Sequence, residues 1–378
     1  MNFEYSEEQQ QLADSVRRYL ANEYDFDKRK AIIGSASGIS EAAWSSFAEM
    51  GLTAIAIAEA DGGFGGGASD LMATMEACGE ALVVEPLLDN IGLAGRLVTR
   101  GGSAAQRAAL LPGLIDGSLR LAFAYLEPGA RYALAPTKTV ARAHAGGWLL
   151  DGEKSVVVGA SVAGKLIVSA RTGGQPGHGD GVSLLMVDRD APGVSLNVYR
   201  TVDGLRAADV RFTGVKLGGD ALLGAPGGAM PLIEEAVDFA TALLCADAIG
   251  TMKNANDATL EYLKTRKQFG VPIGSFQVLQ HRMVDMYIVC EQARSMAILA
   301  ASRVDAGGDP LERQRVVSSA KVKIADAARQ VSQESIQLHG GMGMSEEMKV
   351  SHNFRRLTMI AQRFGDADHH LQRYAALG

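Results

Sequence analysis

The chain after Gly224 limits the fold most strongly, because it contains long stretches of helical periodicity. Apolar residues recur every three or four positions over four segments, 230–266, 277–306, 310–338 and 346–363. Helices of about thirty residues pack antiparallel and bury one apolar stripe each. We therefore expect residues 222–378 to form a C-terminal four-helix bundle.

The first 118 residues favour shorter helices. Ser6 stands as an N-cap ahead of two acidic residues, and glycine-rich breaks such as 61–67 separate the periodic segments. The expected helices cover 6–24, 41–50, 70–82, 87–100 and 104–116. Residues 1–118 are thus expected to be an N-terminal α-helical domain.

Around Leu121 the pattern changes to short alternating or β-branched runs bounded by turn residues. The expected strands cover 121–126, 137–144, 148–151, 155–158, 166–171, 182–187 and 209–215. The polar segment 173–181 is expected to be a mobile hairpin tip. Residues 119–221 therefore form a middle β-barrel or sandwich domain, and the fold class is α+β.

Composition excludes several classes of function. With 47% hydrophobic and 21% charged residues the chain is typical of a globular protein, and its net charge of -6 argues against nucleic acid as a partner. Cys78, Cys245 and Cys290 are far apart, which suggests a reducing compartment. No leader or membrane-spanning run is evident, so we expect a soluble, cytoplasmic protein without a membrane partner.

The most specific motif is the run from Arg266 to Gly274, followed by Phe276 and Gln277. A guanidinium binds phosphate oxygens in a bidentate manner, and an aromatic ring stacks on a base. The run has a purely structural interpretation as well. A helix that ends at Gly270 with Arg266 and Lys267 in its last turn is stabilised by the cap and by the helix dipole.

A second motif runs from Ile336 to Met344 and contains two adjacent glycines. Such glycines let the backbone approach a cofactor closely. Glycines after a helix are by themselves mostly caps.

Together, the two motifs resemble the signatures of acyl-CoA dehydrogenases. The resemblance implies FAD as cofactor and assigns the ADP half of an adjacent subunit's flavin to ten residues: Arg266, Gln268, Phe269, Phe276, Gln277, Gln337, Leu338, His339, Gly340 and Gly341. Further segments match the family in order: 50–65, Glu127–Pro128, the turn Asp151–Lys154, and Leu222–Gly224. The implied reaction converts an acyl-CoA thioester to its α,β-enoyl-CoA, with electron-transferring flavoprotein as the next electron acceptor.

The chain departs from the family around its own flavin ring. Leu126 and 129–134 replace residues that bind the ring and the CoA, and Val156–Val158 replace a Trp-Ile-Thr or Trp-Ile-Ser segment that packs on the ring. These departures support a second hypothesis. The chain would then be a non-catalytic or half-site subunit that completes the flavin site of a different acyl-CoA dehydrogenase chain, so both a homo-oligomer and a hetero-oligomer stay open.

The family's catalytic carboxylate corresponds to the segment Phe364–Arg373. Alignment on Arg373 places Asp366 at the base, whereas alignment on Arg356 places Gly365 there. The first residues of this segment resemble those of pimeloyl-CoA dehydrogenase small subunits. Because this motif is short, the acyl substrate stays open.

Other acidic residues are weaker candidates. The family's alternative base falls at Ala240, and an arginine that contacts CoA falls at Thr241. The nearby carboxylates, Glu234, Glu235 and Asp238, are expected on a solvated helix face. No metal is expected, because adjacent histidines such as His369 and His370 point in different directions on a helix.

Overall fold

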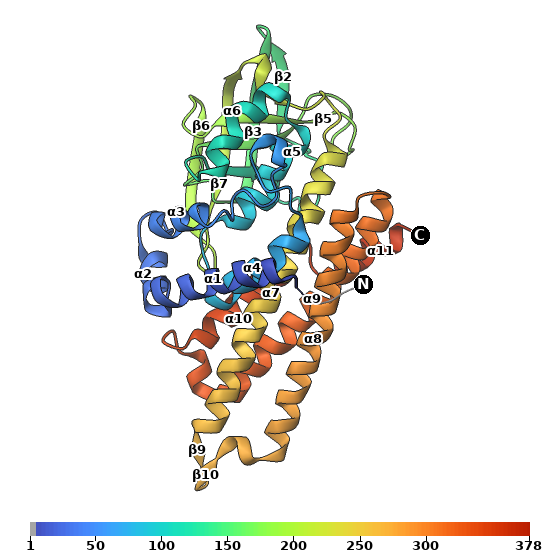
Figure 1. Cartoon of the computed structure of the whole chain (residues 1–378). Helices are drawn as coiled ribbons and strands as arrows, with labels where there is room; N and C mark the ends of the chain where they lie inside the picture. The colour runs from blue at the N-terminus through green and yellow to red at the C-terminus, as the bar shows by residue number, and fades with distance from the viewer. Residues whose placement is uncertain (1–4) are drawn as a thin grey trace. The chain divides into compact units, whose positions relative to one another are not determined.

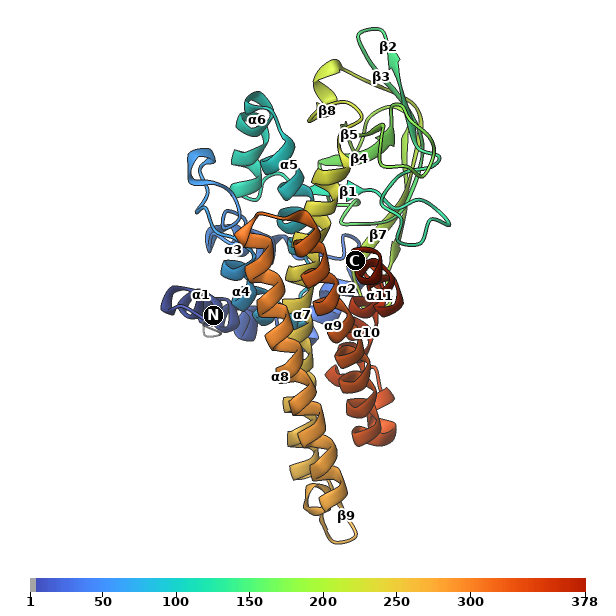
Figure 2. The ribbon, with the colours of Figure 1, turned by 90° about the vertical axis from the view of Figure 1, so that its right-hand side faces the viewer.

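The computed structural model describes residues 5–378, which form two compact units (Figures 1 and 2). One unit contains residues 1–30, 67–83 and 241–378, of which 1–4 are not described, and the other contains 31–66 and 84–240. The boundaries at 118 and 221 that the sequence suggests stay a prediction.

The helical unit contains α1 (Glu7–Glu23), α4 (Ala68–Ala81) and the C-terminal helices. Long helices α8 (Gln277–Ala306) and α9 (Pro310–His339) run alongside α10 (Lys349–Gln362) and the lower part of α7 (Met230–Thr265), as Figures 1 and 2 show. Ser6 is the N-cap of α1, as expected, and it also forms a capping box, with its Oγ accepting from the Gln9 N–H. The sequence did not predict α2 (Phe26–Gly34) or α11 (Ala367–Ala376).

The second unit contains an eight-stranded sheet in the order β6-β7-β3-β2-β4-β5-β8, with β1 (Leu121–Ala124) parallel to β4 (Lys165–Arg171). The remaining strands are β2 (Val140–His144), β3 (Gly147–Val158), β5 (Val182–Asp188), β6 (Val194–Arg200), β7 (Arg206–Leu217) and β8 (Leu222–Leu223). Its core is formed by apolar residues that include Leu150, Leu166, Val187, Val210 and Phe212.

Helices and turns complete the second unit. They are α3 (Glu41–Glu49), η1 (Glu59–Asp61), the π-helix η2 (Leu88–Ala94), α5 (Gly95–Gly101), α6 (Ala104–Ile115) and η3 (Gly219–Ala221). All seven residues of η2 are buried. A single expected helix over 87–100 is therefore divided into a π turn and a short α-helix.

Two sequence interpretations of the sheet are wrong. Residues 148–151 and 155–158 belong to one strand, and the expected turn at Asp151–Lys154 is an irregularity within it, where Gly152 has a φ of 147°. A bulge keeps both halves paired with β7 while re-aiming the side chains. Strand β6 was not expected, although Val194, Leu196 and Val198 alternate with polar residues; all of its side chains are partly or fully exposed.

Segment 173–181 joins β4 to β5, as expected for a hairpin connection. The buried Arg171 guanidinium organises it by donating to the carbonyls of Gly173, His178 and Asp180, and also to Pro136 O. A fork of five N–H donors suits such a cluster of carbonyls.

In the helical unit, α4 crosses α7 at two glycines. A Cβ atom at Gly250 would lie 1.9 Å from the Glu76 carbonyl oxygen, and one at Gly79 would lie 2.2 Å from the Asp247 carbonyl oxygen. Thr251 Oγ1 also donates to Gly79 O over 3.2 Å. The two backbones therefore touch, and no side chain fits between them.

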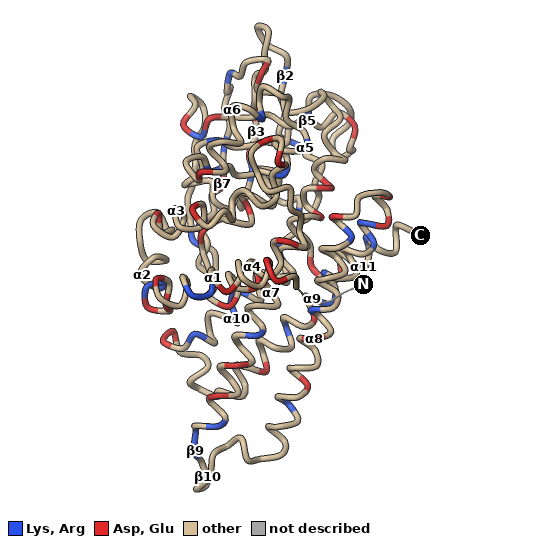
Figure 3. Tube along the Cα trace, in the orientation of Figure 1, with Lys and Arg blue, Asp and Glu red and all other residues tan. Residues whose placement is uncertain are grey.

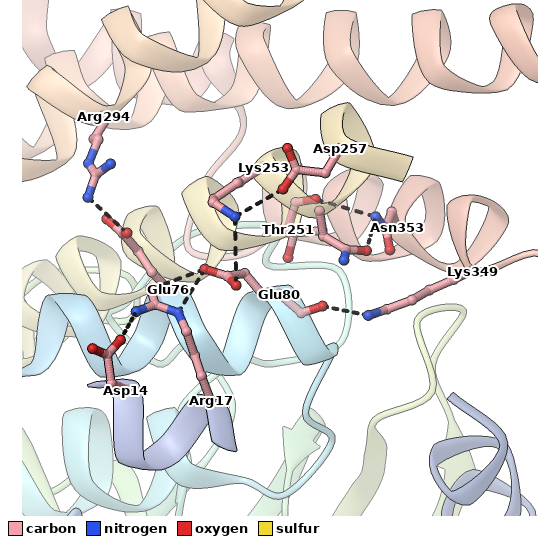
Figure 4. A network of polar contacts seen from close by, with 11 residues as sticks. Asp14, Arg17, Glu76, Glu80, Thr251, Lys253, Asp257, Arg294, Lys349 and Asn353 are labelled. Atoms are coloured by element: carbon pink, nitrogen blue, oxygen red, sulfur yellow. Dashed lines mark hydrogen bonds and ion pairs between the residues drawn. The ribbon is translucent and has the colours of Figure 1, made fainter. Parts of the chain in front are cut away.

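Polar contacts surround this crossing (Figure 4). Glu76 pairs with Arg294 of α8 at 3.2 Å, and Glu80 pairs with Arg17 of α1 at 3.1 Å. Lys349 at the start of α10 donates to Glu80 O over 2.7 Å. These contacts join α4 to helices on several sides.

We predict that Gly250→Ala lowers the free energy of unfolding by roughly 1–3 kcal/mol, because the added methyl group forces α4 and α7 apart. Thermal unfolding measures the change. Gly34→Ala is the control, since nothing lies within 4 Å of a Cβ atom there. Equal melting temperatures for Gly250→Ala and the parent would contradict the argument.

Candidate cofactor and active site

The Arg266 motif forms a β-hairpin rather than a helix end. Helix α7 ends at Thr265, and β9 (Lys267–Gln268) pairs antiparallel with β10 (Val271–Pro272). Phe269 and Gly270 have φ values of 55° and 80°, as two-residue hairpin turns require. The structural interpretation of Gly270 as a helix C-cap is therefore wrong, because the chain pairs with itself before α8 begins.

The side chains of this hairpin are exposed. Phe269 is 90% exposed and makes an edge contact with Phe276, at 6.1 Å between ring centroids. Within the described part of the chain, the Arg266 guanidinium has no hydrogen-bond or ion-pair partner, and Gln268 and Gln277 are exposed. Basic residues lie beside β9 in Figure 3. The tip thus presents an unpaired cation and an aromatic face.

The second motif lies at the end of α9. Gly340 has a φ of 61° and caps the helix, and η5 (Gly340–Met344) follows it. Nothing in the structure lies within 4 Å of a Cβ atom built at Gly340 or Gly341. Their backbone therefore faces open space, whereas Leu338 and His339 are buried and Gln337 is exposed.

The two motifs lie at the same end of the bundle. The ring of His339 stacks on Tyr262, near the end of α7, with 4.4 Å between centroids. Arg282 near the start of α8 pairs with Glu334 near the end of α9 at 2.5 Å. The end of α7 and the start of α8 are thus brought together with the end of α9.

The segment expected to meet the chain's own flavin ring contains strained backbone. Val156 is 43% exposed and has a φ of 53°, which is rare for a β-branched residue. Its N–H donates to Asp209 Oδ1 over 3.2 Å, and that oxygen also accepts from the Tyr199 hydroxyl over 3.0 Å. The surface here is aliphatic, because Leu126 and Val158 flank it with partly exposed side chains.

A buried ion pair fixes the neighbouring loop. Lys154 Nζ lies 3.4 Å from Glu127 Oε1, and both side chains are almost fully buried. Burial alone would raise the pKa of Glu127, but Lys154 and the N–H groups of Thr137 and Thr139 lower it to about 2. Lys154 also donates to Tyr125 O and to Ser169 Oγ. The pair is therefore ionised and ties the end of β1 to β3.

Asp366, the candidate base, is the N-cap of α11. Its Oδ1 accepts from the His369 N–H over 2.8 Å. Together with Asp368 it lines a cavity of about 380 Å³ between α9, α10 and α11. Gly365, at the alternative register, has a φ of 123°.

Two of the three candidate carboxylates near the start of α7 are engaged within the fold rather than solvated. Glu235 pairs with Arg96 at 2.6 Å, and Asp238 is fully buried. The expectation for these two residues is therefore wrong. Periodicity alone did not reveal the burial of Asp238 or the partner of Glu235, because both depend on segments that pack against α7. Ala240 and Thr241 are also buried.

Within residues 5–378, no helix is long and apolar enough to cross a membrane. In the same range, no group of three or more His, Cys, Asp or Glu residues is arranged to hold a metal ion.

Comparison with known protein families identifies the class of protein to which this fold belongs. Residues 6–118 match the acyl-CoA dehydrogenase N-terminal domain, 122–215 the middle domain and 228–376 the C-terminal domain. The chain belongs to the acyl-CoA dehydrogenase family, whose members are oxidoreductases. This confirms the expected fold of an N-terminal helical domain, a middle β domain and a C-terminal bundle.

Among curated relatives, the acyl-CoA dehydrogenase FadE12 of Mycobacterium tuberculosis is 30% identical over 361 residues, covering 93% of this chain and 90% of its own. Among solved structures, a variant of the Tcur3481-Tcur3483 steroid ACAD has a TM-score of 0.87 at 30% identity, covering 98% of this chain and 97% of its own. PigA with FAD and proline has a TM-score of 0.90 at 26% identity, covering 100% and 98%. FAD is the cofactor of this family.

Two buried histidines predict a pH dependence of stability. Burial lowers the pKa of His370 to about 3 and that of His352 to about 4. The unfolded state binds these protons more readily than the folded state. The contribution of the two neutral histidines to the free energy of unfolding is therefore fully present above about pH 6.5 and is lost as the pH falls below it. Each histidine contributes a slope of up to about 1.4 kcal/mol per pH unit.

We expect His370→Gln to flatten the fall in melting temperature between pH 6.5 and 5. His144→Gln, at an exposed position of β2, is the control that keeps the parental slope. Parallel curves for His370→Gln and the parent would show that His370 does not titrate in this way.

Proposed function

We propose that this chain is a subunit of an FAD-dependent acyl-CoA dehydrogenase that converts an acyl-CoA thioester to the α,β-enoyl-CoA. One observation carries the proposal: the exposed Arg266 hairpin and the open backbone of Gly340 and Gly341 lie at the same end of the bundle. The family membership supports the reaction type.

The residues of the two motifs fit the ADP half of FAD. Arg266 supplies an unpaired guanidinium for the pyrophosphate, and Phe269 and Phe276 offer aromatic surfaces for the adenine. Gln268, Gln277 and Gln337 are exposed hydrogen-bonding side chains around them. Leu338 and His339 are buried, so their side chains anchor the backbone that leads into Gly340 and Gly341.

Bound FAD supplies the hydride acceptor. This chain contributes Asp366 as the base that removes the proton α to the thioester carbonyl. A carboxylate that lines a cavity is placed to meet a substrate that enters the cavity. Electron-transferring flavoprotein is the proposed acceptor of the electrons from the flavin, on the basis of the family resemblance.

A second candidate function is that of a half-site subunit without a reaction of its own. The aliphatic surface at Leu126 and at Val156–Val158 favours it, because a flavin ring bound there loses hydrogen bonds to its polar edge. The two-part designation of the 30% identical Tcur3481-Tcur3483 structure is in keeping with a second, unlike chain. In either case the ADP half belongs to the flavin of a neighbouring subunit.

The burial of Cys78, Cys245 and Cys290 supports a reducing, cytoplasmic location for this assembly.

We predict that Arg266→Ala weakens FAD retention by about tenfold to a hundredfold, since hydrogen bonds to charged groups contribute about 1.5–3 kcal/mol. The melting temperature of the FAD-free protein should be unchanged, because the side chain is exposed and unpaired. Flavin fluorescence released on dilution measures retention. Lys264→Ala, which removes an exposed cation in the last turn of α7 just before Arg266, is the control.

A reduced melting temperature with normal FAD retention would contradict the role of Arg266 and restore a purely structural one.

We predict that the chain expressed alone holds less than one FAD per chain and does not reduce an acceptor dye with acyl-CoA. Each unsatisfied polar group at the ring edge costs about 1–3 kcal/mol, or about tenfold to a hundredfold in affinity. Coexpression with a second, unlike acyl-CoA dehydrogenase chain should restore both. Absorbance at the flavin bands, per chain, measures occupancy.

One tightly bound FAD per chain with turnover by the lone protein would reject the need for a second chain. In that event Asp366→Asn should abolish turnover while FAD stays bound, and continued turnover would remove Asp366 as the base.

A further inference from the structure

Lys321 is a buried cation in the middle of α9. Its side chain has no exposure to solvent, and within residues 5–378 its ammonium forms no ion pair. It donates to two carbonyl oxygens instead, Gly365 O at 2.7 Å and Ala361 O at 3.1 Å. Burial lowers its pKa to about 8, against the attraction of Cys245 and Asp366. A buried charge is costly, so its contacts have to compensate for lost hydration.

The two carbonyls lie on either side of the end of α10. Ala361 is in the last turn of that helix, where the carbonyls carry the negative end of the helix dipole. Gly365 directly precedes Asp366. One ammonium group therefore links a helix end to the residue before the candidate base.

A second pair of side chains holds the same bend. His370 Nε2 lies 3.2 Å from Phe364 O, and His370 Nδ1 lies 3.2 Å from Ser318 Oγ. A neutral ring protonated on Nε2 satisfies both contacts. Ser318 and Lys321 are three positions apart on α9 and so share a face. Consecutive carbonyls, of Phe364 and Gly365, are thus both held toward α9.

The bend requires such support, because its backbone is strained. Phe364 has a φ of 59° and Gly365 a φ of 123°. A non-glycine residue at positive φ costs about 1 kcal/mol or more, and such residues persist where surrounding contacts fix them. Without the ammonium, two buried carbonyls lose their donor and the bend has less reason to keep this conformation.

We propose that Lys321 is a positioning residue for the active site: it holds the 364–366 bend against α9 and so fixes the direction of the Asp366 carboxylate. The inference rests on the proposed function for its catalytic consequence, but the structural part is independent of which residue is the base.

The first test is hydrogen–deuterium exchange of the purified assembly, with the second chain present if activity requires it. Lys321→Met keeps the length of the side chain and removes its donors. Exchange of peptides covering 362–371 should rise at least tenfold, while exchange in α8 stays at the parental rate. Lys323→Met is the matched control on the same helix, since Lys323 bonds only a surface glutamine side chain, Gln292. Unchanged exchange at 362–371 would overturn the proposal.

The second test separates positioning from substrate binding. Lys321→Met should lower kcat by roughly a hundredfold with KM within about threefold of the parent, as expected for a misplaced base. Lys321→Arg, which keeps a donor, should recover part of the loss. If Lys321→Met does not fold, Lys321→Gln, which removes the charge and shortens the side chain, takes its place in both tests. An unchanged kcat in Lys321→Met, in an enzyme that Asp366→Asn inactivates, would overturn the proposal.

Failure of the proposed function has a different signature. If Asp366→Asn retains turnover, Asp366 is not the base, and the exchange measurement alone decides whether Lys321 holds the bend.

Discussion

The close approach of α4 and α7 at Gly79 and Gly250 is the constraint on which the helical unit depends. Direct backbone contact leaves no room for a side chain, so the two helices have one relative position. The free backbone N–H and C=O groups at the two ends of α4 then form hydrogen bonds with side chains from other helices. Asp305 accepts from the Ala68 and Ser69 N–H groups, and Arg29 and Arg356 donate to Leu82 O and Val83 O. Acidic groups at a helix N-terminus and cations at its C-terminus also suit the helix dipole.

This packing sets the position of the candidate site indirectly. Helix α7 passes the crossing and continues to Tyr262, whose ring stacks on His339 and so fixes the start of the Gly340–Gly341 segment. Two residues of α10, Lys349 and Arg356, donate hydrogen bonds to backbone carbonyls at the end of α4 and just after it. The other end of α10 leads into the 364–366 bend. The candidate cofactor motifs and the candidate base therefore follow helices whose positions are fixed by backbone contact and by buried hydrogen bonds at other points along their length.

The site combines groups of two kinds. Arg266 is exposed and unpaired within the described chain, and Phe269 is 90% exposed, as expected of residues that meet something outside it. Lys154, Glu127 and Lys321 are buried and fully engaged with internal partners. Exposed groups of the first kind are suited to binding, whereas buried ones hold the loops that carry the candidate active-site residues.

The sequence by itself determined the long bundle helices, most strands and the two glycine- and arginine-containing motifs. Apolar periodicity and turn residues are local signals, which is why the bounds of α8 agree with the pattern to the residue. Tertiary structure decided the rest. Only pairing across the tip made 267–272 a hairpin, and only packing paired Glu235 with Arg96 and buried Asp238. Val156 and Phe364 have positive φ values beside bonds from distant residues: Asp209 accepts from the Val156 N–H from 53 positions away, and Lys321 donates to Gly365 O from 44 positions away. Burial and backbone strain are set by contacts between distant segments, so a local pattern does not contain them.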